Sequence, residues 1–204
     1  MAGRVGINAS LENDCELLKV LLADPSVFDQ SHLHAMVLRS VETADELRVV
    51  LASLALLYRP RLMLMMFGGH CSPPTIYQPA ALLRFRGSAT GLSAIRLAPL
   101  LRALNATATF VLLDCCYSTA VFRQLSFPGL IVVPACGALQ RTDSTFTGQK
   151  FVPMLRGTCG QDAECIRFRA DCAQQGGRVS ILRLIEHLCH HLKLDDASHV
   201  RTDQ

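Results

Sequence analysis

The sequence lacks a long hydrophobic run. None of its apolar stretches approaches the roughly 18 to 20 residues that a membrane-spanning helix needs, and residues 1–6 lack the apolar stretch of a signal peptide. It also lacks an excess of either charge, because the formal net charge is only +3. We therefore expect a cytoplasmic protein that neither enters a membrane nor binds nucleic acid through a basic surface.

Repeats, low-complexity tracts and convincing linkers are absent as well. A chain of 204 residues, half of them hydrophobic, is large enough for one sizeable core, and we expect a single domain over residues 1–204. Its nine cysteines are an odd number with irregular spacing. Because thiols stay reduced inside cells, most of these cysteines are expected to be small buried hydrophobic residues.

One stretch, residues 109–119, combines an apolar run with reactive side chains. Residues 110–113 are apolar at consecutive positions, which is typical of a strand buried on both faces of a parallel sheet. Asp114, Cys115 and Cys116 follow directly. Because ligands bind at the carboxyl edge of such sheets, the two cysteines are either a reactive site or a consequence of the cysteine-rich composition.

A second apolar run decides between these two interpretations. Residues 61–67 are predicted to form a strand that leads into Gly68, Gly69, His70 and Cys71. Two neighbouring strands that end in histidine and cysteine would bring an imidazole and a thiol together. His70 lies 46 residues before Cys116, and the caspase pattern has its histidine about 50 residues before the cysteine.

Strands and helices alternate along the chain, which favours a parallel α/β sheet with right-handed crossovers. A capping pattern, Thr43 followed by Glu46, precedes a helix at 44–58 with Leu47, Leu51, Leu54 and Leu57 on one apolar face. The other predicted helices are 11–22, 92–104, one through 121–125, a short one from 151, and 181–192. Strands are predicted at 5–8, 35–38, 82–85 and 130–133, with 158–175 irregular and 195–204 a polar tail.

These motifs, in this order, resemble the metacaspases of the caspase-like cysteine peptidase superfamily. Residues 67–70 resemble the Tyr-Ser-Gly-His-Gly block of that family, 114–118 its Asp-Ser/Cys-Cys-His/Tyr-Ser-Gly block, and 6–8 with 13–15 its first strand and Asn-Asp-Ala helix start. The resemblance covers most of the chain. It implies a three-layer sandwich in which helices cover both faces of a mostly parallel sheet.

The sequence departs from this family at several points. Cys71 and Thr119 stand where glycines are usual, so the Cys71 side chain is expected to crowd the cleft. The acidic loop that carries calcium in many metacaspases is not visible after His70, although the resemblance implies calcium activation. The ends are short, which fits a chain excised from a longer protein, and a sixth strand is not evident.

The resemblance also assigns roles to residues. Cys116 would be the nucleophile and His70 the base that activates it, without a metal or another cofactor. Backbone amides of Cys116 and of residues 69–71 (Gly69, Cys71) would stabilise the oxyanion. Asp14 and Asp114 match the two aspartates of the family's substrate pocket, and Gly68 replaces its serine. The implied substrates are peptides or proteins cleaved after Arg or Lys, and the linker at 124–128 is too short to suggest a processed, two-chain enzyme.

Several other interpretations remain open. Asp114 could cap the following helix, and Cys115 could be a packed neighbour. Zinc binding is disfavoured because the spacing of paired zinc ligands is missing. The whole protein could be an inactive pseudopeptidase that acts as a scaffold or regulator for a protein partner, or a signalling domain that brings no thiol and imidazole together.

Overall fold

The computed structural model describes residues 41–85, 90–137, 139, 151–153, 163–174 and 201–202, together with Glu16 and Val20. The chain divides into two compact units. One comprises Met1–Arg39 with Asp143–Asp196, and the other Ser40–Thr142 with Ala197–Gln204. The expected single domain stays a prediction. In the described part of the chain, no helix is long and apolar enough to cross a membrane.

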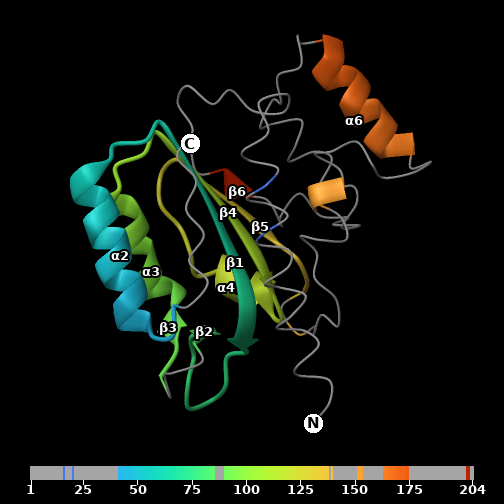
Figure 1. Ribbon diagram of the computed structural model, residues 1–204. Helices are drawn as coiled ribbons and strands as arrows, with labels where there is room; N and C mark the ends of the chain where they lie inside the picture. The colour runs from blue at the N-terminus through green and yellow to red at the C-terminus, as the bar shows by residue number, and fades with distance from the viewer. Residues whose placement is uncertain are drawn as a thin grey trace. The chain divides into compact units, whose positions relative to one another are not determined.

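The second, larger unit is built on a mixed sheet with the strand order β3-β2-β1-β4-β5-β6 (Figure 1). Its centre consists of parallel strands: β1 (Leu62–Ser72), β4 (Ala108–Cys115) and β5 (Leu130–Pro134). Antiparallel pairings add β2 (Leu82–Arg84), β3 (Leu92–Ser93) and β6 (Arg201–Thr202) at the edges. The predicted α/β fold with a parallel centre is thus confirmed, whereas the caspase-like arrangement and helices on both faces stay predictions.

The apolar runs of the sequence form the buried centre of this sheet. All residues of β5 are buried, and so is every residue of β4 after Ala108. Burial on both faces explains why these strands show no alternation of polar and apolar residues. Backbone hydrogen bonds from Thr109 to Gly129 (2.8 Å) and from Ala135 to Leu113 (3.0 Å) extend the contact between the two strands.

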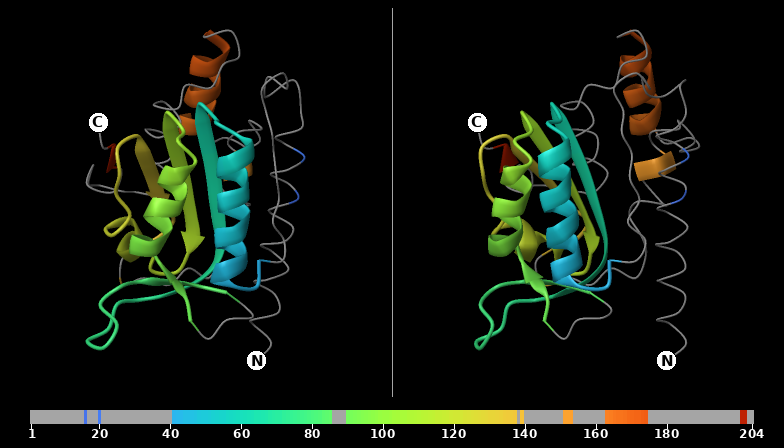
Figure 2. Two further views of the ribbon diagram at one scale, coloured as in Figure 1. Left: turned by 90° about the vertical axis from the view of Figure 1, so that its left-hand side faces the viewer. Right: turned by 60° about the vertical axis from the view of Figure 1, so that its left-hand side comes forward.

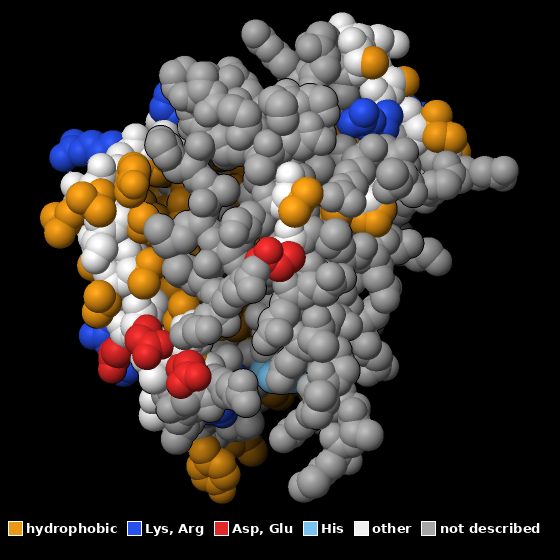
Figure 3. All heavy atoms as spheres, viewed as in Figure 1, with side chains coloured by type: hydrophobic (Ala, Val, Ile, Leu, Met, Phe, Trp, Pro, Cys, Tyr) orange, Lys and Arg blue, Asp and Glu red, His pale blue; other side chains and the backbone are white. Residues whose placement is uncertain are grey.

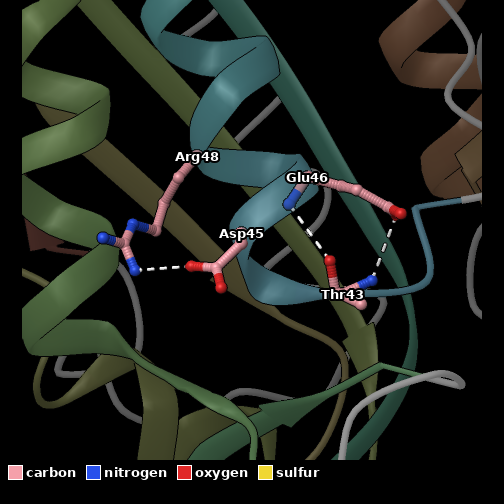
Figure 4. Close-up of polar contacts among 4 residues, drawn as sticks. All are labelled: Thr43, Asp45, Glu46 and Arg48. Atoms are coloured by element: carbon pink, nitrogen blue, oxygen red, sulfur yellow. Dashed lines mark hydrogen bonds and ion pairs between the residues drawn. The ribbon is translucent and has the colours of Figure 1, made fainter.

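Two helices, α2 (Ala44–Leu57) and α3 (Ala94–Ala103), lie side by side on one face of the sheet (Figure 2). They confirm the helices predicted at 44–58 and 92–104, except that β3 takes the first two residues of the latter. The predicted capping box starts α2: the Thr43 hydroxyl accepts from the Glu46 amide at 3.1 Å, and the Glu46 carboxylate accepts from the Thr43 amide at 3.2 Å (Figure 4).

The predicted apolar face of α2 is correct for its first part only. Leu47 and Leu51 are buried in the core, and Leu54 packs against it. Leu57 is 73% exposed, because ten positions at 100° per residue place it about 80° around the helix from Leu47. Hydrophobic side chains consequently appear on the outer surface over α2 (Figure 3).

In the smaller unit, α6 (Ala163–Gln174) corrects the expectation that 158–175 is irregular. Cys165, Phe168 and Cys172 recur at spacings of three and four residues, which is a helical pattern, and Phe168 is buried. The sequence pattern did not indicate this helix because Ile166 and Phe168 are the only large apolar residues in it. Strands 5–8 and 35–38 and helix 181–192 lie outside the described residues; in the predicted helix 11–22, Glu16 and Val20 are helical.

The larger unit contains two further differences from the sequence-based expectations. Strand β1 continues beyond Phe67, through His70 to Ser72, because its last residues pair with β2 in the register His70 with Arg84. The tail also contains β6, which pairs with β5 in the register Val132 with Arg201. The β5–β6 pairing joins segments far apart in the chain, and the β1–β2 pairing joins strands separated by residues 73–81. The apolar pattern of residues 61–67 did not indicate the extension of β1, and the polar tail did not indicate β6.

Candidate functional site

The register between β1 and β4 brings the two sequence motifs together. Gly68 lies beside Asp114, and Gly69 lies beside Cys115. The next residues along the two strands are His70 and Cys116. The sheet thus carries the predicted imidazole and thiol to neighbouring positions at the carboxyl ends of adjacent parallel strands.

Alternation of side chains along a strand assigns these residues to faces of the sheet. Cys115 lies on the face of Val111 and Leu113, which belong to the core beneath α2 and α3. Asp114 therefore lies on the opposite face, with Gly68 and His70. Of the predicted site, Gly68, His70 and Asp114 share this face, and Cys116 is the first residue after β4.

The candidate catalytic pair is more exposed than the two residues that precede Cys116. His70 is exposed and Cys116 is half-buried, so a substrate can reach both. Asp114 is only 2% exposed and Cys115 is fully buried. The interpretation of Cys115 as a packed neighbour is confirmed by its place in the core.

A tight strand-turn-helix connection follows the candidate nucleophile. Tyr117 has a left-handed backbone conformation (φ 56°, ψ 24°) and is the N-cap of the short helix α4 (Ser118–Phe122). A residue other than glycine is strained in this region, and such strain is often found at functional sites. Because Tyr117 occupies the N-cap position, the interpretation of Asp114 as the helix cap is wrong.

Two buried hydroxyl groups fix this turn to the segment that follows β5. The Thr119 hydroxyl donates to the Cys136 carbonyl at 2.6 Å, and the Ser118 hydroxyl donates to it at 3.0 Å. In return, the Cys136 amide donates to the Ser118 hydroxyl at 2.9 Å. Sequence reasoning treated Thr119 only as a lost glycine, and nothing local in the sequence indicated Cys136 as its partner.

Cys71 lies on the opposite face from His70, where it is 7% exposed and belongs to the core beneath α2 and α3. The expectation that its side chain crowds the cleft is therefore wrong. A hydrogen bond from Cys115 lowers the pKa of the Cys71 thiol, with smaller contributions from the Leu82 backbone and the Arg84 charge, against an opposing effect of burial. The same hydrogen bond, together with burial, raises the pKa of Cys115.

Two further residues of the predicted site are Gly69 and Asp14. Gly69 lies in β1, where an added Cβ would approach the Phe67 ring at 3.1 Å, so the position has little room for a side chain. Asp14 is outside the described residues. Among the residues that the structure describes, no group of three His, Cys, Asp or Glu side chains could hold a metal ion.

No protein-family model matches the sequence. Comparisons with curated proteins and with solved structures likewise found no significant match. The function is therefore inferred from the residues and their arrangement.

Proposed function

We propose that the protein is a cysteine endopeptidase of metacaspase type, with Cys116 as nucleophile and His70 as general base. The observation that carries the proposal is the register of β1 and β4, in which Gly69 lies beside Cys115 and each is followed by one member of the pair. The exposure of His70 and the half-buried position of Cys116 add support, because a peptide has to reach both. The described Cys71, Cys115, Cys116 and Cys136 are reduced and not joined in disulfides, which suits the reducing cytoplasm.

The chemistry would proceed by acyl transfer. His70 takes the proton of the Cys116 thiol, and the thiolate attacks the scissile carbonyl to form a carbon-sulfur bond while the carbonyl π electrons move to oxygen. As the tetrahedral intermediate collapses, the carbon-nitrogen bond breaks and the protonated His70 donates its proton to the leaving amine. A water molecule activated by His70 then releases the acyl group and regenerates the thiol.

The negative oxygen of the intermediate needs a donor near Cys116. Successive amides of a strand point to opposite edges, so one of the His70 and Cys71 amides points toward β2 and the other toward β4. The amide that points toward β4 lies past Gly69 and Cys115, which are the last pair of residues in the ladder between β1 and β4. This amide and that of Cys116 are the proposed oxyanion donors. Neither of these two backbone donors depends on the side chain of Cys71, which lies in the core.

Asp114 is proposed to select the substrate. Its carboxylate is buried and shares a face with Gly68 and His70, and carboxylates form charge-assisted hydrogen bonds with Arg and Lys side chains. Glycine at position 68, directly beside Asp114, places no side chain of its own next to that carboxylate. Cleavage is accordingly proposed to follow Arg or Lys, with Asp14 as the second pocket residue by resemblance.

Hydrolysis of fluorogenic peptides with Arg, Lys or Asp before the scissile bond, with and without calcium, tests this function. The wild type should cleave after Arg and Lys, Cys116→Ala should be inactive, and His70→Ala should be at least about 100-fold slower. Asp114→Asn should lose the preference for basic residues, while Asp45→Asn, at an exposed carboxylate on α2, should retain it. A folded, reduced wild type that cleaves none of the peptides would indicate the scaffold function instead.

A further inference from the structure

The face of the sheet beneath the candidate site carries a pair of thiols that the proposed peptidase reaction does not use. Cys71 is two residues beyond Gly69 on β1, and Gly69 lies beside Cys115 on β4. Because side chains two positions apart project to the same face, Cys71 and Cys115 are diagonal neighbours on adjacent strands. Both belong to the core cluster beneath α2 and α3.

A hydrogen bond between the two thiols is the largest influence on the pKa of each, and the Cys71 thiol also donates to the Ser72 carbonyl at 3.5 Å. Both are free cysteines, 7% and 0% exposed. A third thiol, that of Cys136, is held by the backbone: it donates to the Cys115 carbonyl at 3.2 Å and accepts from the Ser118 hydroxyl at 3.5 Å. Cys136 accordingly has these partners, whereas Cys71 and Cys115 are diagonal neighbours of each other.

We propose that Cys71 and Cys115 are a redox site that hydrogen peroxide converts into a reversible disulfide between β1 and β4. The chain thus carries a modification site distinct from the Cys116 nucleophile, and the proposal does not depend on peptidase activity. Peroxide is the oxidant because it is small enough to reach a sulfur that is only 7% exposed.

The two thiols are suited to different steps. The hydrogen bond from Cys115, the Leu82 backbone and the positive charge of Arg84 favour the thiolate of Cys71, and the thiolate is the nucleophile toward peroxide. The Arg84 guanidinium is held at this end of the sheet by its hydrogen bond to the Ser72 hydroxyl at 2.6 Å. Cys115 stays protonated and adjacent, as a resolving thiol does.

The reaction balances with one peroxide per pair. The Cys71 thiolate attacks one peroxide oxygen; a sulfur-oxygen bond forms, the oxygen-oxygen bond breaks, and the other oxygen leaves as water after taking a proton. The sulfur of Cys115 then attacks the resulting sulfenic acid; the sulfur-sulfur bond forms, and the hydroxyl group leaves as a second water with the thiol proton. Two thiols are oxidised and one peroxide is reduced to two waters, and an added dithiol reverses the change by exchange.

Forming this bond would alter the ends of both strands. With strands about 4.8 Å apart and about 3.3 Å per residue, diagonal neighbours in paired parallel strands have Cα atoms about 8 Å apart, whereas a disulfide needs about 4.4–6.8 Å. The bond therefore draws the end of β4 and the end of β1 together. His70 adjoins one of the bonded residues and Cys116 adjoins the other, so oxidation acts on the candidate site from its opposite face.

Peptide mapping by mass spectrometry tests the proposal. The folded, reduced full chain carrying Cys116→Ser is treated with peroxide, blocked with an alkylating reagent and digested with trypsin without reduction. Tryptic peptides 62–84 and 103–123 then contain Cys71 and Cys115 as their sole cysteines, so a cross-link between them identifies the bond without ambiguity. We expect this cross-linked pair to appear with peroxide and to disappear after dithiothreitol treatment.

Two matched variants complete the test. In the same background, Cys71→Ala should abolish the cross-link, whereas Cys136→Ala should leave it unchanged. If Cys71→Ala unfolds by circular dichroism, the mapping of the Cys116→Ser chain alone decides. Peroxide treatment that leaves both thiols reduced, links either of them to Cys136, or yields only sulfinic or sulfonic acid at Cys71 would overturn the proposal.

Discussion

Thr119 stands where the resembled motif has glycine, and its side chain has a structural role. Its hydroxyl donates to the Cys136 carbonyl at 2.6 Å in a site where Thr119 is 1% exposed. Because this carbonyl also accepts from the Thr119 amide at 3.2 Å, the segment after β5 is fixed to the turn that carries Cys116. The departure from the glycine of the resembled motif is thus compatible with an ordered site.

Replacing Thr119 with valine keeps the shape of the side chain but removes its donor. We expect Thr119→Val to lower the free energy of unfolding by about 1–2 kcal/mol, since a buried hydrogen bond is lost. The exposed Thr107 provides the control, and Thr107→Val should change it by less than about 0.5 kcal/mol. Urea denaturation measures both, and equal effects of the two substitutions would rule out the proposed anchor.

The pair of core thiols leads to a prediction about pH. In the wild type the pKa of Cys71 is lowered chiefly by the hydrogen bond from Cys115, so Cys115→Ala should raise it, while Cys136→Ala should not. The pH dependence of Cys71 alkylation, followed by mass spectrometry, reports this pKa because only the thiolate reacts. The midpoint should move to higher pH in Cys115→Ala; an unchanged or lower midpoint would contradict the hydrogen-bonded pair.

At the scale of whole elements, the sequence was informative where local patterns decide the structure. The continuous apolar runs at 110–113 and 130–133 correctly indicated buried parallel strands, and Thr43 with Glu46 correctly indicated the start of α2. The extension of β1 through His70 depends on pairing with β2, which no local pattern encodes. The face on which Cys71 lies could not be predicted from a local pattern either, because the predicted strand ended before that residue.

The capping box of helix α2 can be tested by substitution. Thr43→Ala removes the side-chain acceptor of the capping box and should lower the free energy of unfolding by about 1 kcal/mol. Ser53 is a suitable control, since its hydroxyl bonds only within the helix, to the Val49 carbonyl at 2.9 Å. Ser53→Ala should be neutral or slightly stabilising. Thermal unfolding compares the stability of the two variants. If Thr43→Ala were as stable as Ser53→Ala or more stable, the capping role would be contradicted.

In the molecule as a whole, the larger unit carries the residues of the two proposed chemistries on opposite faces of one sheet edge. One face carries the exposed His70 with the buried Asp114 at the end of β4, and the other buries Cys71 with Cys115. The sequence predicted which residues meet at this edge, because the apolar runs that form β1 and β4 could be recognised from composition. It could not predict the division between faces, since that depends on the register of strands that are distant in the chain.

Covalent labelling tests the central claim, the catalytic pair of Cys116 and His70, most directly. The reduced full chain is incubated with a peptide that ends in arginine and carries an electrophilic ketone at the position of the scissile carbonyl, and the label is located by mass spectrometry. We predict a single label on Cys116, little label with an aspartyl reagent, and at least about 100-fold slower labelling in His70→Ala. Labelling of Cys116 at the same rate in His70→Ala, or of several cysteines without preference for arginine, would contradict the account.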